Sequence, residues 1–168
     1  KHNRNGLPEG ENAWSFPLLF VSEGDESVKK GQAMGAEFFW NPAVTPPEID
    51  RMLHAAAEID SRLGVESGGR ELVFVPAPAG ELGVTTGVGR IEIAAGGVAA
   101  AARGVGLALA GIEARQRSSF SLLGVMIDCS RNKVFTVDYL KRYLVWLALT
   151  GCNTAMLYTE ETYELPDE

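Results

Sequence analysis

Two apolar runs decide the fold of this chain: LLGVMIDCSRN (residues 122–132) and NTAMLYTEE (residues 153–161). Each run holds about five consecutive apolar residues, which is typical of a strand buried on both faces of a parallel sheet. Between the runs, Thr136 is placed to cap a helix whose apolar residues recur at helical spacing up to Gly151. A strand, a helix and a second strand within about 40 residues predict one βαβ unit with a right-handed crossover.

The sequence before these runs predicts further strands and two helices. Strands are expected over residues 16–21, 72–75 and 90–94, while residues 36–40 are either a strand or a turn. A capping box at Thr45 predicts a helix that continues to Gly64. A second helix is expected over residues 98–112, with Gly104 and Gly106 allowing it to approach the sheet closely. The fold class is therefore α/β.

These elements divide the chain into three parts. We expect a loose N-terminus over residues 1–15, an α/β domain over 16–116 and a βαβ unit over 117–168, after a polar linker at 113–119. One βαβ unit leaves its apolar strands without neighbours, so the second domain is expected to be incomplete. The chain also begins at Lys1 rather than Met, and we therefore expect it to be processed or an excised piece.

Composition excludes several classes of function. The 168 residues carry 15 basic and 22 acidic side chains, a net charge of −7 without a basic stripe, which argues against nucleic acid and anionic membranes as partners. No apolar window is long enough to span a bilayer. Cys129 and Cys152 are expected at opposite ends of neighbouring strands, on the order of 16 Å apart, too far for a disulfide. Free thiols favour a cytoplasmic location, with a removed signal peptide as the alternative.

Polar side chains follow both apolar runs. Asp128 and Arg131 come after the first run, and Glu160 and Glu161 come after the second. Because parallel strands end at one edge of a sheet, these groups are expected on a common rim, where an arginine and carboxylates can bind sugar hydroxyls. Tyr158 and Tyr163 are candidates for stacking on a sugar ring. The alternative is a surface salt bridge between Arg131 and a glutamate.

The two runs together resemble the opening of a family 20 glycoside hydrolase barrel, whose first strand reads roughly G-h-h-h-D-x-S/A-R with h apolar. By this resemblance, Arg131 would hold hydroxyls of a terminal N-acetylhexosamine, Asp128 would be a structural partner on the rim, and Glu160 and Glu161 would bind substrate. The family's acidic pair is usually Asp-Asp, and an Arg often stands where this chain has Leu123. The segment before the linker resembles the non-catalytic α/β domain that precedes the (β/α)8 TIM barrel.

The resemblance implies a β-N-acetylhexosaminidase that removes terminal β-linked N-acetylhexosamine from glycans by substrate-assisted retaining hydrolysis. It implies no metal or organic cofactor, and an oligomer is possible. The family's catalytic Asp-Glu pair would lie beyond this chain, so the isolated chain is expected to be inactive. The alternative is a non-catalytic α/β carbohydrate-binding or interaction module in which the βαβ unit extends the first domain's sheet.

Overall fold

A computed structural model describes residues 36–65, 68–130 and 134–160. Every described residue belongs to one compact unit, Met34–Glu168. The expected loose N-terminus over residues 1–15 and the expected strand over residues 16–21 therefore lie outside the described residues.

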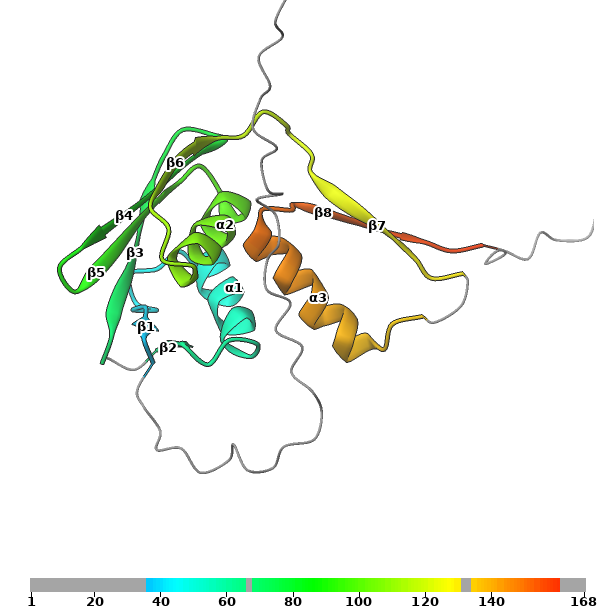
Figure 1. The fold of residues 1–168 in the computed structure, drawn as a ribbon, viewed down its shortest axis with the longest axis horizontal. Coiled ribbons are helices and arrows are strands. Elements are labelled where there is room, and N and C mark those ends of the chain that lie inside the picture. Colours follow the sequence, from blue (N-terminus) through cyan, green and yellow to red (C-terminus); the bar gives the residue numbers. More distant parts are fainter. Residues whose placement is uncertain (1–35, 66–67, 131–133, 161–168) are drawn as a thin grey trace, which may run out of the picture. The chain divides into compact units, whose positions relative to one another are not determined.

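A mixed six-stranded sheet forms the first part of this unit, with the order β2-β1-β3-β5-β4-β6 (Figure 1). Its strands are β1 (Phe38–Phe39), β2 (Leu63–Gly64), β3 (Arg70–Pro76), β4 (Glu81–Gly87), β5 (Arg90–Ala95) and β6 (Ala114–Arg117). The pairs among β1, β2, β3 and β5 are parallel, whereas β4 runs antiparallel to both β5 and β6. The structure thus has the expected α/β content.

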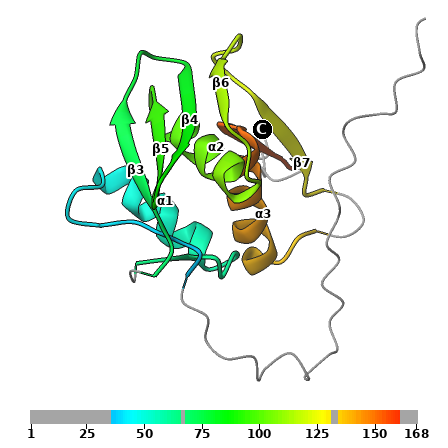
Figure 2. The same ribbon diagram turned by 60° about the vertical axis from the view of Figure 1, so that its left-hand side comes forward.

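Two helices, α1 (Pro47–Ala57) and α2 (Val98–Leu109), cover one face of this sheet (Figures 1 and 2). Alternate strand residues such as Leu72 and Ile93 point toward them, and Leu53 and Val105 meet these side chains from the helices. Both Leu53 and Ile93 are fully buried. This apolar core closes without any contribution from the βαβ unit's strands.

The βαβ unit is present as predicted: β7 (Gly124–Asp128), α3 (Val137–Thr150) and β8 (Thr154–Tyr158), with β7 and β8 parallel. Thr136 caps the helix by accepting a hydrogen bond from the backbone N–H of Tyr139 at 3.3 Å. Gly151 ends the helix at a φ of 103°, a left-handed conformation that glycine adopts without strain. Helix α3 packs against α2 (Figures 1 and 2).

The predicted start and end of α1 are wrong. The Thr45 hydroxyl donates to the carbonyl of Asn41 at 2.9 Å, and the helix instead begins after Pro46 without a side-chain cap. It ends at Ala57 rather than at Gly64. The carboxylate of Asp60 accepts hydrogen bonds from Arg62, and this local turn competes with continuing the helix.

The predicted linker at residues 113–119 is also wrong, because Ala114–Arg117 is strand β6, paired with β4. Strand β4 was not predicted at all. Both strands lack a run of apolar residues, and β6 at the edge of the sheet has one side free for polar side chains. Strand β6 pairs with the distant β4, which local patterns do not report, whereas β4 is joined to β5 by a tight turn at Val88 and Gly89.

The two glycines of α2 both permit close packing, but against different elements. A Cβ on Gly104 would collide with Ile93 of the sheet, as the prediction requires. A Cβ on Gly106 would instead collide with the backbone carbonyl of Leu149 in α3. Gly106 therefore permits a close contact between two helices, and the prediction for it is wrong.

The βαβ unit does not extend the six-stranded sheet, because β7 and β8 form a separate two-stranded sheet. The version of the non-catalytic module that requires one continuous sheet is therefore wrong. Among the described helices, none has the length and apolar character needed to span a bilayer. Cys129 and Cys152 are both free thiols, as predicted.

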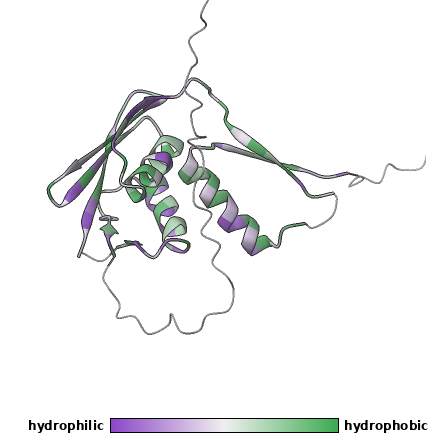
Figure 3. Ribbon diagram, viewed as in Figure 1, coloured by the Kyte–Doolittle hydropathy of each residue, from purple (hydrophilic) through white to green (hydrophobic). Residues whose placement is uncertain are grey.

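Apolar side chains of the two-stranded sheet are exposed on both of its faces. Met126 and Met156 lie opposite each other and are 62% and 53% exposed. On the other face, Ile127 is buried but its neighbour Leu157 is 51% exposed. Figure 3 shows hydrophobic residues, in green, along β7 and β8. Parallel strands with two apolar faces are normally covered on both sides, and these are not covered by the described residues.

Candidate functional site

The carboxyl ends of β7 and β8 bring two polar loops together at one edge, which we call the rim. Asp128 lies opposite Tyr158 in the register of the pair, and the backbone N–H of Cys129 donates to the carbonyl of Tyr158 at 2.8 Å. The two loops therefore start side by side. Of the predicted site residues, the structure describes Asp128, Tyr158 and Glu160. The others, Arg131, Glu161 and Tyr163, lie outside the described residues.

Asp128 shapes the first loop of the rim. Its Oδ1 accepts hydrogen bonds from the backbone N–H of Ser130 at 2.8 Å and from the Ser130 hydroxyl at 2.6 Å. This arrangement is a turn closed by an aspartate side chain, and it fixes the direction in which the chain leaves β7. Asp128 thereby determines where the loop toward Arg131 begins.

Glu160 and Tyr158 form a polar pair on the second loop. The Tyr158 hydroxyl donates to Oε1 of Glu160 at 2.8 Å, which holds the carboxylate beside the aromatic ring. Tyr158 is 38% exposed, so its ring remains accessible. An accessible ring next to a carboxylate offers apolar contact and hydrogen-bond acceptors, which are the two features that a sugar uses in binding. Both residues are predicted from the sequence, but their pairing is not. The two-residue spacing at the strand end, which places both side chains on one face, is the signal for it.

Asn153 fixes the opposite end of the strand pair. Its side chain accepts from the backbone N–H of Leu123 and donates to the carbonyl of Ser121, both at 2.8 Å. Its backbone N–H also donates to the carbonyl of Leu123 at 2.8 Å. The segment entering β7 is therefore tied to the start of β8, which sets the parallel register and hence the alignment of the two loops at the rim.

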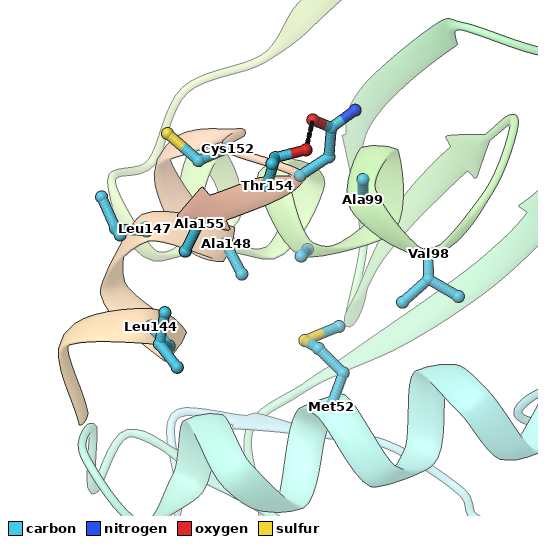
Figure 4. A pocket seen from close by; sticks show the side chains of 11 residues that line it. Met52, Val98, Ala99, Leu144, Leu147, Ala148, Cys152, Thr154 and Ala155 are labelled. Atoms are coloured by element: carbon cyan, nitrogen blue, oxygen red, sulfur yellow. Dashed lines mark hydrogen bonds between the residues drawn. The ribbon is translucent and has the colours of Figure 1, made fainter. Parts of the chain in front are cut away.

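An apolar pocket lies at this Asn153 end of β8, away from the rim (Figure 4). Its volume is about 390 Å³. Side chains from α1, α2 and α3, including Met52, Ala99 and Leu147, converge on it together with Cys152. None of the described residues lining it carries a charge, so it offers little for catalysis, and we assign it to packing between the helices.

A close ion pair lies elsewhere, between Asp60 and Arg62, whose carboxylate and guanidinium groups are 2.7 Å apart. The side-chain hydrogen bond from Arg62 lowers the pKa of Asp60, and the same bond raises the pKa of Arg62. Arg62 also donates to the carbonyl of Leu109 at 2.9 Å, which satisfies a backbone acceptor at the end of α2. This pair ties a loop to a helix end and has a structural role.

Buried aromatic side chains give no additional binding surface. Trp40 is 1% exposed, and its indole N–H donates to Asp50 at 2.8 Å. His54 lies on the surface of α1 with its ring 5.2 Å from that of Trp40. Within the described part of the chain, no group of three or more His, Cys, Asp or Glu residues is arranged to hold a metal ion.

In comparisons with known proteins, no protein-family model matches the chain, and no curated protein matches it.

Proposed function

We propose that this chain is the front of a glycoside hydrolase resembling the family 20 β-N-acetylhexosaminidases. It would supply the non-catalytic α/β domain and the first βαβ unit of the catalytic TIM barrel. The observation that carries the proposal is the parallel pair β7–β8, with polar loops at one rim and exposed apolar side chains on both faces. A barrel covers both faces of such strands and places its site at this rim.

Each rim residue has a distinct part in the proposed reaction. Arg131 would hold ring hydroxyls of the terminal N-acetylhexosamine through its fork of N–H groups. Glu160, held by the Tyr158 hydroxyl, would accept a hydrogen bond from a further hydroxyl, and Glu161 would assist it. Asp128 would orient the loop that carries Arg131 by closing its turn on Ser130.

In the proposed chemistry, the substrate's own 2-acetamido oxygen attacks the anomeric carbon while an acid protonates the leaving oxygen. The Asp-Glu pair that supports these steps in the family would come from a later strand of the barrel. Glu160 and Glu161 are not assigned to it. In this proposal the 168-residue chain on its own is inactive. The substrates of the intact protein are glycans that contain N-acetylhexosamine, and the protein is located in the cytoplasm.

The test is hydrolysis of 4-nitrophenyl N-acetyl-β-D-glucosaminide and its galacto epimer by the full-length protein. Arg131→Ala should raise KM and lower kcat/KM by about 100-fold, because charge-assisted hydrogen bonds to the sugar are lost. Arg142→Ala is the matched control, since Arg142 is an exposed arginine on α3. An unchanged kcat/KM in Arg131→Ala would overturn the role of Arg131. Absence of hydrolysis of either epimer by the wild type would overturn the proposed function.

A further inference from the structure

We draw no further inference here: the strongest candidate, the partly exposed aromatic surface patch of Tyr139, Tyr143 and Trp146 on helix α3, carries none, because nothing in the structure shows what covers it.

Discussion

Strand β5 of the six-stranded sheet and strands β7 and β8 of the two-stranded sheet all carry apolar residues, yet these residues reach different degrees of burial. Ile91 and Ile93 of β5 are 1% and 0% exposed beneath helices α1 and α2. Met126 and Met156, on neighbouring strands β7 and β8, are 62% and 53% exposed. The first sheet has one apolar face and two helices to cover it, whereas the second has two apolar faces and a helix that packs on α2 instead.

This difference shows that a local stretch of sequence can specify the elements of a βαβ unit but not the partners that cover its strands. The βαβ unit has the caps, the helix and the strand register that it needs, but the described residues do not supply neighbours that would cover its strands. An exposed apolar surface of this kind marks a site of further packing. The proposed barrel is one structure that would supply that packing, with the rim as its substrate-facing edge.

The largest expected effect is on the core of the first sheet. Ile93→Ala should lower the free energy of unfolding by about 2–5 kcal/mol, because it leaves a cavity among fully buried side chains. Met156→Ala, at an exposed position of the second sheet, should change it by less than about 0.5 kcal/mol. Urea denaturation of both variants of the 168-residue chain measures this. Equal losses would contradict the contrast between the two sheets.

A second effect is expected where the two regions meet. Gly106→Ala would place a Cβ against the carbonyl of Leu149 and should cost about 1–3 kcal/mol, since a backbone atom cannot move aside easily. Gly68→Ala is the matched control, because a Cβ there has no neighbour within 4 Å. Thermal unfolding followed by circular dichroism compares the two. A neutral Gly106→Ala would show that α2 and α3 are not in close contact.

The register of the second sheet gives a smaller effect. Asn153→Ala removes two side-chain hydrogen bonds to the segment entering β7 and should cost about 1 kcal/mol. Amide hydrogen exchange at Leu123 should become faster. Asn41→Ala, which removes a side-chain hydrogen bond to Ala43 in the first region, should leave that amide unaffected. An unchanged exchange rate of the Leu123 amide in Asn153→Ala would show that Asn153 does not fix the register.

The smallest effect concerns pH. Because Arg62 lowers the pKa of Asp60 below its ordinary 3.8, the ionised carboxylate stabilises the folded state above that pH. The contribution is lost as the pH falls below 3.8 through the lowered folded value. At pH 7, Asp60→Asn should cost less than about 1 kcal/mol, since Arg62 is 46% exposed. Urea midpoints of the two proteins should converge toward pH 2, and a constant gap would contradict this.

The βαβ unit could be predicted from sequence because its signals are local. Thr136 and Gly151 mark the ends of α3, and β8 occupies the predicted residues 154–158. Strand β6 could not be predicted in this way, because its residues are mostly polar and it pairs with the distant β4. Strand β4 lies next to β5 across a tight turn at Val88 and Gly89, but its small and polar residues gave no apolar pattern. The end of α1 depends on a side-chain turn at Asp60 that competes with the helix.

The candidate site was predictable in part for the same reason. The parallel ends of β7 and β8 place Asp128 and Tyr158 side by side, as the strand pattern indicates. The hydrogen bond from Tyr158 to Glu160 depends on how the chain turns after β8, and hydropathy carries no information on that turn.

The most direct test of the account is oxidative footprinting of Met126 and Met156 in the 168-residue chain and in the full-length protein. Both methionines are more than half exposed on the second sheet, and the proposed barrel would cover them. We predict rapid oxidation in the 168-residue chain and at least about tenfold slower oxidation in the full-length protein. Equal rates of oxidation in the two proteins would contradict the account, because the apolar faces of β7 and β8 would then be a permanent surface.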